Sequence, residues 1–241
     1  FVYADRAEKS ILEPVIKVAK ERKKKFREID LSKVIDDVHL DQNLSKIYDY
    51  IFAEIDECSV DYSVFIGDRR EIMFACLAFF VKGVKIHQLA AGDLSEKITL
   101  VDDYFRHLIT IMTSKQVCFS EKSKETSDSI LQSLGLEANS RMIVNPTLSD
   151  IDVTSENRII QEKYDLVLVH PQSLSRSDTE KDRDMTLSLI SKERKTVIIK
   201  GNRDLHYDVL YGLWEDLSAQ ENIEVFQNLE KERFINLLKN C

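Results

Sequence analysis

The chain has 241 residues, enough for one large domain or two modest ones, and 43% of them are hydrophobic and 32% charged. These proportions are ordinary for a soluble globular protein. The net charge of −8 and the pI of about 5.3 argue against sequence-independent binding of nucleic acid, which needs a basic face. The lysine-rich segment 20–25 ends a predicted helix, where positive charge complements the helix dipole, so we expect no nucleic-acid partner.

Cysteine usage and hydropathy indicate a cytoplasmic protein with no membrane partner. The four cysteines, Cys58, Cys76, Cys118 and Cys241, form no CxxC pair, and we expect Cys76 and Cys118 to be core thiols because they lie inside apolar runs. Isolated core thiols fit a reducing compartment. No window approaches the roughly 18 consecutive apolar residues that span a bilayer, and no signal peptide is recognised.

Strand-like apolar runs alternate with helical periods from the start of the chain to about residue 144. The predicted strands cover residues 1–3, 62–66, 85–89, 116–119 and 142–144, the first of them being the end of a strand. The predicted helices cover residues 10–21, 43–55, 71–81, 102–112 and 123–134, and Gly135 stops the last one. This alternation predicts a parallel sheet with right-handed crossovers.

A second alternating set follows Asn145-Pro146 and the polar segment 149–157, which together predict a domain boundary. Its predicted strands cover residues 164–169, 196–199 and 223–226, and its predicted helices cover 182–191, 207–217 and 230–239. The fold class is therefore predicted as α/β, with two Rossmann-like domains at residues 1–150 and 151–241. We expect the second domain to be incomplete because the sequence stops on a helix.

Charged segments close several of these apolar stretches. They are Gly67-Asp68-Arg69, Ala90-Ala91-Gly92-Asp93 and Asp102-Asp103-Tyr104-Phe105-Arg106-His107. In an open α/β sheet the ligand binds where the strands end, so carboxylates and arginines at that edge suggest a site for a polar, anionic ligand. Arg6 lies at a further strand-to-helix turn, whose free N–H groups suit a phosphate.

Taken in order, these segments resemble the UDP-N-acetylglucosamine 2-epimerases, with the hydrolysing branch closest. The matching motifs are the Arg6-Ala7-Glu8 turn with Leu12-Glu13-Pro14, the Gly67-Asp68-Arg69 turn, the loop ending at Asp93, the Asp102-Asp103 helix with Arg106-His107, the strand-end His170-Pro171 and the Asn202-x-Asp204 loop. Each motif alone is weak, but six in order at comparable separations make a specific signal.

The resemblance implies a glycosyltransferase-B-like pair of domains with a UDP-sugar bound in the cleft between them. It implies loss of UDP from C1 with removal of the C2 proton, which gives a 2-acetamidoglucal that adds water in the hydrolysing branch or UDP in the other. It requires no metal or redox cofactor. Crowded carboxylates suit the acid and base, and arginines with helix N-termini suit the diphosphate.

The same resemblance implies a role for each matching residue. The catalytic group comprises Asp68, Asp93, Asp102 and His170. The group that binds substrate or UDP comprises Arg6, Ser10, Arg69, Asp103, Arg106, Asn202 and Asp204. On this view Asp68, residues 88–93 and His170 line one cleft, and Arg6 and Arg106 bind phosphate without contributing much to stability.

The sequence departs from the family pattern at two places. Ala90 stands where the family carries a catalytic glutamate, and Gln88 where it carries histidine, unless a one-residue shift makes His87 the match. Asp93 is the nearest substitute carboxylate. The family also continues past Cys241 into a turn and helix that grip the diphosphate, so we expect this sequence to be part of a longer chain or a divergent relative.

Local structural roles compete with these functional ones. Asp68 and Asp102 are also candidates for helix N-caps, and Asp103 for a charge in a first helical turn. Arg106, four residues after Asp102, is a candidate for a helix-face ion pair.

Three alternative functions therefore remain: a 2-epimerase, a catalytically silent nucleotide-sugar-binding relative, and a glycosyltransferase of the same architecture. The paired acids have no obvious use in simple glycosyl transfer, which disfavours the third function. The sequence leaves the exact hexosamine, the hydrolysing or non-hydrolysing outcome and a homodimeric state open.

Overall fold

The structure is a computed structural model of residues 1–241 that describes all of them except 35–39, 58, 96–99, 149–157, 202–204 and 228. The chain divides into two compact units, Phe1–Asp150 and Ile151–Cys241, which we describe one at a time.

The first unit alternates strands and helices. Its strands are β1 (Val2–Tyr3), β2 (Ile29–Asp30), β3 (Tyr62–Ile66), β4 (Lys85–Leu89), β5 (Lys115–Cys118) and β6 (Ser140–Met142). Its helices are α1 (Arg6–Glu21), α2 (Leu40–Glu57), α3 (Arg70–Val81), α4 (Val101–Met112) and α5 (Glu121–Ser133), with short 3-10 turns at Leu31–Lys33 and Pro146–Leu148.

All pairings in this sheet are parallel, and the strand order is β2-β1-β3-β4-β5-β6. The chain therefore runs from β1 to β2 in one direction and from β3 to β6 in the other. The order reverses between β1 and β3, whose paired residues are Val2 and Phe65. In open α/β sheets, ligands bind at the carboxyl ends of the strands on either side of such a reversal.

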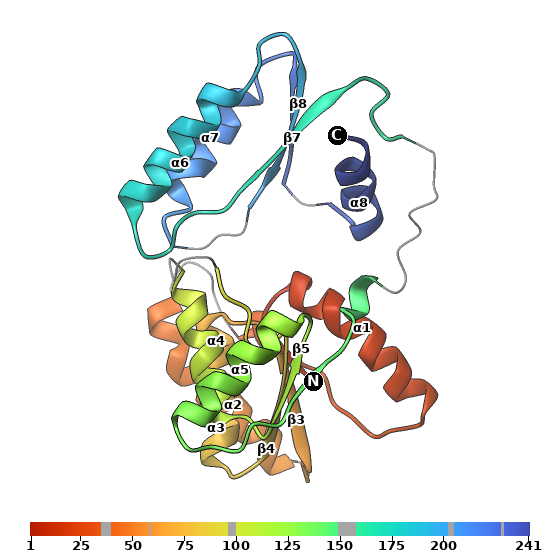
Figure 1. Cartoon of the computed structure of the whole chain (residues 1–241), viewed down its shortest axis with the longest axis vertical. Helices are drawn as coiled ribbons and strands as arrows, with labels where there is room; N and C mark the ends of the chain where they lie inside the picture. The colour runs from red at the N-terminus through yellow and green to blue at the C-terminus, as the bar shows by residue number, and fades with distance from the viewer. Residues whose placement is uncertain (35–39, 58, 96–99, 149–157, 202–204, 228) are drawn as a thin grey trace. The chain divides into compact units, whose positions relative to one another are not determined.

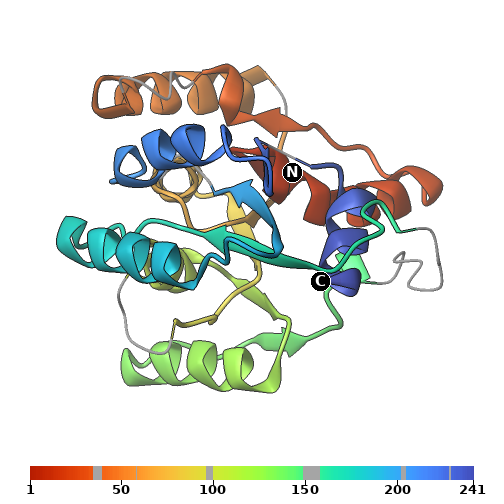
Figure 2. The same ribbon diagram turned by 90° about the horizontal axis from the view of Figure 1, so that it is seen from above.

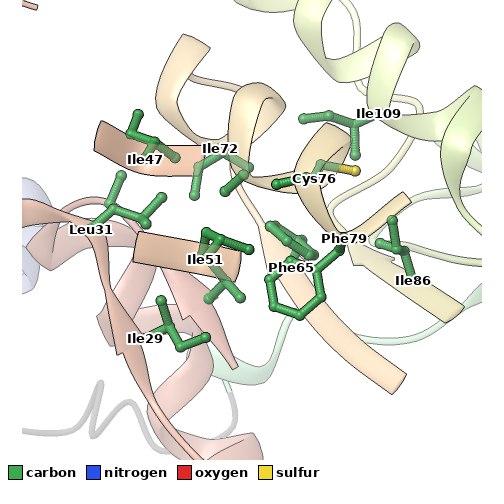
Figure 3. Packing of buried hydrophobic residues seen from close by; sticks show 14 residues of the cluster. Ile29, Leu31, Ile47, Ile51, Phe65, Ile72, Cys76, Phe79, Ile86 and Ile109 are labelled. Atoms are coloured by element: carbon green, nitrogen blue, oxygen red, sulfur yellow. The ribbon is translucent and has the colours of Figure 1, made fainter. Parts of the chain in front are cut away.

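Helices cover both faces of this sheet (Figure 1). On one face Leu12 and Ile16 of α1 pack with Tyr3, Ile66 and Leu89. On the other face, α2, α3 and α4 bury a larger cluster whose labelled members surround Phe65 in Figure 3. The Phe65 and Phe79 rings meet edge to face with centroids 5.4 Å apart. Burial on both faces holds the strand ends in fixed positions.

The second unit contains a parallel three-stranded sheet of order β7-β8-β9. Its elements are β7 (Tyr164–Val169), α6 (Arg176–Leu189), β8 (Lys195–Lys200), α7 (Asp208–Leu217), β9 (Ile223–Phe226) and α8 (Lys231–Asn240). Helices α6 and α7 lie side by side on one face, where Trp214 is buried (Figures 1 and 2). Leu237 of α8 packs on the other face with Tyr164 and Val197.

The predicted α/β class with parallel sheets is confirmed, and the buried thiols predicted for Cys76 and Cys118 are present. Cys58 lies outside the described residues. Several helices begin earlier than predicted, among them α1, α5 and α6, where Asp5, Ser120 and Ser175 cap the first turn. Strand β2 was not predicted, because two residues are too few to show an alternating pattern.

Candidate active site at the carboxyl ends of β1, β3 and β4

The turn after β1 is closed by a reciprocal capping box. The Oδ1 atom of Asp5 accepts a hydrogen bond from the Glu8 N–H at 2.8 Å, and the Glu8 side chain accepts from the Asp5 N–H at 3.3 Å. Arg6 is the first residue of α1, and its side chain lies outside the description. Ser10 lies one turn further along the helix and is half-buried. The N–H groups that a cap leaves unused at a helix start can bind an anion.

The turn after β3 carries Asp68 on the other side of the strand-order reversal. Gly67 adopts a φ of +97°, a left-handed conformation that favours glycine. Arg69, not Asp68, is the N-cap residue of α3, so the capping alternative for Asp68 is wrong. The Arg69 guanidinium lies 3.7 Å from an Asp5 carboxylate oxygen and 3.5 Å from one of Glu71, which links the two turns.

Arg106 of α4 is the centre of the charged cluster. Its Nη2 forms an ion pair with Asp68, and its Nη1 lies 3.0 Å from Asp103 Oδ1. Nη1 also donates to the Asp93 carbonyl oxygen at 2.7 Å. Burial lowers the pKa of Arg106 to about 10, which still leaves the guanidinium charged at neutral pH. One side chain thus joins α4 to the turns after β3 and β4.

The paired acids of α4 differ in their surroundings. Asp103 is only 2% exposed and accepts hydrogen bonds from the Ser95 hydroxyl and, at 3.4 Å, from the Ser95 N–H. Asp102 is half-buried in the first turn. Leu100 is the N-cap residue of α4, so the capping alternative for Asp102 is wrong, while the first-turn position expected for Asp103 is confirmed. Both acids lie where a helix dipole favours negative charge.

The loop after β4 is fastened to α5. Gly92 has a φ of +76°, and a Cβ added there would lie 1.9 Å from the Ser123 carbonyl oxygen. The Asp93 Oδ1 atom accepts a hydrogen bond from the Ser123 hydroxyl, whereas Oδ2 has no hydrogen-bond partner among the described residues. Ala90 also has a positive φ, 57°, which is a strained conformation for alanine. Ser123 therefore holds Asp93 at one of its carboxylate oxygens.

The residues that align with the family histidine serve the packing of the sheet. Gln88 is fully buried and links β4 to α4, since its Nε2 donates to the Arg106 carbonyl oxygen at 3.1 Å and its Oε1 accepts from the Thr110 hydroxyl at 2.8 Å. The His87 ring stacks on Tyr62 with centroids 4.8 Å apart. Desolvation, followed by the charges of Lys115 and Lys85, lowers the pKa of His87.

In the second unit, His170 follows β7 and is exposed. Its ring lies against Gly201, where an added Cβ would be 2.7 Å from the Val169 carbonyl oxygen and 3.0 Å from His170 Nδ1. Asn202 and Asp204 lie outside the described residues. The structure brings Asp68, Asp93, Asp103 and Arg106 together within the first unit.

The described residues offer no candidate for a metal-binding group or a membrane-spanning helix. They contain no group of three or more histidine, cysteine or acidic side chains arranged to hold a metal ion. None of the helices in this described part is both long and apolar enough to traverse a bilayer.

Sequence reasoning assigned no role to three polar side chains that shape the site: Glu8, Ser95 and Ser123. Only Glu8 left a signal, because Asp5 followed three residues later by a glutamate is the pattern of a capping box. Ser95 and Ser123 contact Asp103 and Asp93 through tertiary folding, which a single sequence does not reveal.

Gly92→Ala tests the attachment of this loop to α5, with Gly83→Ala as its matched control. Both glycines have a left-handed φ, but an added Cβ meets nothing within 4 Å at Gly83. We expect Gly83→Ala to lower the free energy of unfolding by about 1 kcal/mol. Gly92→Ala should cost about 1–3 kcal/mol more from overpacking. Urea denaturation measures both values, and equal losses would contradict the packing of Gly92 against Ser123.

Arg106→Ala should destabilise the fold, contrary to the sequence-based expectation of little effect. Removing the guanidinium leaves the buried Asp103 carboxylate without its cation, a change that costs about 3 kcal/mol or more. Arg27→Ala is the control, because its ion pairs with Glu54 and Glu57 are more exposed and should be worth about 1 kcal/mol or less. Thermal and urea unfolding compare the two variants. A small loss of stability in Arg106→Ala would contradict this structural role and support phosphate binding by Arg106.

Comparison with known proteins gives consistent matches. A sequence model described as UDP-N-acetylglucosamine 2-epimerase matches residues 19–241. The GDP/UDP-N,N'-diacetylbacillosamine 2-epimerase (hydrolyzing) of Campylobacter jejuni is 22% identical over 220 residues, which is 85% of this chain and 56% of that protein. The chain therefore spans little more than half the length of that curated relative.

Solved structures share the fold. The UDP-GlcNAc 2-epimerase of Methanocaldococcus jannaschii, in complex with UDP-GlcNAc and UDP, matches with a TM-score of 0.77 and 15% identity over 99% of this chain and 75% of that one. The Rickettsia bellii UDP-N-acetylglucosamine 2-epimerase matches with a TM-score of 0.70 and 12% identity over 99% and 71%. Because the family model covers most of the sequence, the chain belongs to the UDP-N-acetylglucosamine 2-epimerase family.

Proposed function

We propose that this protein is a hydrolysing 2-epimerase that converts a UDP-N-acetylhexosamine into UDP and the free 2-epimer, N-acetylmannosamine when the substrate is UDP-N-acetylglucosamine. The observation that carries this proposal is the cluster of Asp68, Asp103 and Arg106, which lies beside the reversal of strand order in a chain of this family. The Campylobacter jejuni relative bears the description hydrolyzing, which favours that branch.

The proposed reaction needs one proton removed and one supplied. A carboxylate takes the C2 proton, the C2–H electron pair becomes the C1=C2 double bond, and the C1–O bond breaks with its electrons leaving on UDP. Water then adds its oxygen to C1 of the 2-acetamidoglucal, and C2 receives a proton on the opposite face. Neighbouring carboxylates in a partly buried cluster can supply both the base and the acid that this exchange needs.

The side chains divide between chemistry and binding. Asp68 is the candidate catalytic acid or base, because one of its oxygens pairs with Arg106 and the side chain remains 24% exposed. Arg6, Ser10 and the start of α1 are proposed to bind the diphosphate. Arg69 is proposed to contact the substrate.

The roles of four further residues are proposed from the family resemblance alone. Asp102 completes the catalytic set on α4, and His170 is proposed to assist from the second unit. Asn202 and Asp204 are proposed to bind the nucleotide.

Asp93 is proposed as the carboxylate that replaces the glutamate absent at Ala90. Ser123 holds its Oδ1, and its Oδ2 is free of hydrogen bonds among the described residues, as a proton acceptor requires. Aspartate is one methylene shorter than glutamate, so the substrate must approach this loop closely.

A second candidate function, a silent nucleotide-sugar-binding relative, is favoured by Ala90 itself. Its methyl group supplies no acid or base at that position. Such a protein would bind UDP and catalyse neither UDP release nor exchange at C2.

Asp68→Asn tests the proposed chemistry. The wild-type protein, given UDP-N-acetylglucosamine in heavy water, should release UDP and incorporate deuterium at C2. The variant should be slower by about 10²–10⁴-fold, the usual contribution of a general acid or base, with unchanged affinity for UDP. Chromatography follows UDP, mass spectrometry follows deuterium, and calorimetry follows affinity. UDP binding without release or exchange by the wild type would select the silent relative.

Asp93→Asn separates catalysis from loop attachment. Asparagine retains the Oδ1 acceptor for Ser123 but cannot take a proton, so stability should hold while turnover falls by about 10²–10⁴-fold. Ser123→Ala is the matched control, since it removes the hydrogen bond and keeps the carboxylate. Wild-type turnover by Asp93→Asn would show that Asp93 only fastens the loop.

A further inference from the structure

We propose that Glu8 is a positioning residue for Gly67-Asp68-Arg69, the turn that carries the candidate catalytic carboxylate. This inference rests on the proposed function, because it concerns the placement of Asp68. Glu8 belongs to α1 and the turn follows β3, so the contact crosses the strand-order reversal at which the site is built.

One oxygen of Glu8 fastens the turn after β1. Glu8 is 6% exposed, and its Oε2 accepts hydrogen bonds from the Ala4 N–H at 2.5 Å and the Asp5 N–H at 3.3 Å. The Asp5 carboxylate returns a hydrogen bond to the Glu8 N–H. Two backbone N–H groups thus hold the Glu8 carboxyl group in place, and the Asp5 carboxylate closes the capping box.

The other oxygen supports the turn after β3. A Cβ added to Gly67 would lie 1.9 Å from Glu8 Oε1 and 2.6 Å from Glu8 Cδ, so the Gly67 backbone rests directly on the carboxyl group. Only glycine permits this approach, and its φ of +97° also favours glycine. Oε1 is buried and has no hydrogen-bond partner among the described residues. This oxygen therefore lies against the turn that leads to Asp68.

The charges around Glu8 favour its neutral form. The pKa of Glu8 is raised to about 8, chiefly by burial and then by the negative charge of Asp5, while the two backbone hydrogen bonds and the charge of Arg69 oppose the shift. Arg69 also faces the carboxylates of Asp5 and Glu71. If Glu8 ionises, a third carboxylate attracts Arg69, the residue next to Asp68. Ionisation of Glu8 should therefore displace the turn.

The pH dependence of stability follows from the same shift. Because folding raises the pKa of Glu8 from 4.5 to about 8, its contribution to stability is complete below pH 4.5 and is lost as pH rises through about 8. Glutamine imitates the protonated acid at every pH. The melting temperature of the wild type relative to Glu8→Gln should therefore fall between pH 5 and 8.

The test compares Glu8→Gln and Glu8→Ala with Glu13→Gln, an exposed glutamate on the same helix. At pH 7, Glu8→Ala should lower kcat by about 10²-fold, the effect of a small misplacement of a reacting group. We expect the wild-type kcat to decline above pH 8, and Glu8→Gln should retain kcat at pH 7 without that decline. Glu13→Gln should follow the wild type throughout.

Hydrogen–deuterium exchange over residues 66–70 reports on the turn after β3 and does not depend on catalytic activity. Exchange there should be faster in Glu8→Ala and unchanged in Glu8→Gln at pH 7. Unchanged exchange in a folded Glu8→Ala protein, or a wild-type pH profile in Glu8→Gln, would overturn the proposal. If Glu8→Ala does not fold, the Glu8→Gln profiles of melting temperature and exchange against pH decide. If the wild type shows no turnover, the proposed function fails, and hydrogen–deuterium exchange still tests the positioning role of Glu8.

Discussion

The ion pairs of one guanidinium hold the candidate site together. Arg106 binds Asp68 after β3, the carbonyl oxygen of Asp93 after β4 and Asp103 on its own helix. Two carboxylates share this cation, so the cluster keeps a negative charge and leaves Arg106 little capacity for phosphate. The geometry favours Arg106 as the residue that fixes the acids. The start of α1, with Arg6, is then the better candidate for binding the diphosphate.

The topology explains why these groups meet. The strand order reverses between β1 and β3, so α1 and α3 lie on opposite faces and their first turns converge at one sheet edge. Glycines allow the close contacts that this convergence needs. Gly67 lies against Glu8, and Gly92 lies against Ser123, so the turns after β3 and β4 each rest on the first turn of another helix. Close contacts at these two glycines therefore position the turns that carry Asp68 and Asp93.

Much of the fold followed from the sequence because its elements are long and periodic. Strands 62–66, 85–89, 164–169 and 223–226 were predicted with the observed ends. Helix starts were less well predicted where a side-chain cap begins the helix before its apolar period, as at Ser175. The two-residue strand Ile29–Asp30 carries no period and was missed.

For the site, the sequence identified which turns carry charge but not how the charges pair. Asp68 and Arg106 were both candidates, yet their ion pair, the 2% exposure of Asp103 and the attachment of Asp93 to Ser123 depend on tertiary contacts. The sequence analysis named Glu8 only as part of the Arg6-Ala7-Glu8 motif, and its burial against Gly67 required the structure.

The most direct test of this account is a crystal structure of the protein with UDP-N-acetylglucosamine. The account predicts electron density for the ligand at the carboxyl ends of β1 and β3. The diphosphate should lie at the start of α1, and C2 of the hexosamine should lie about 3–3.5 Å from the Asp68 carboxylate. Density for the ligand at another part of the chain, with Asp68 out of contact, would contradict it.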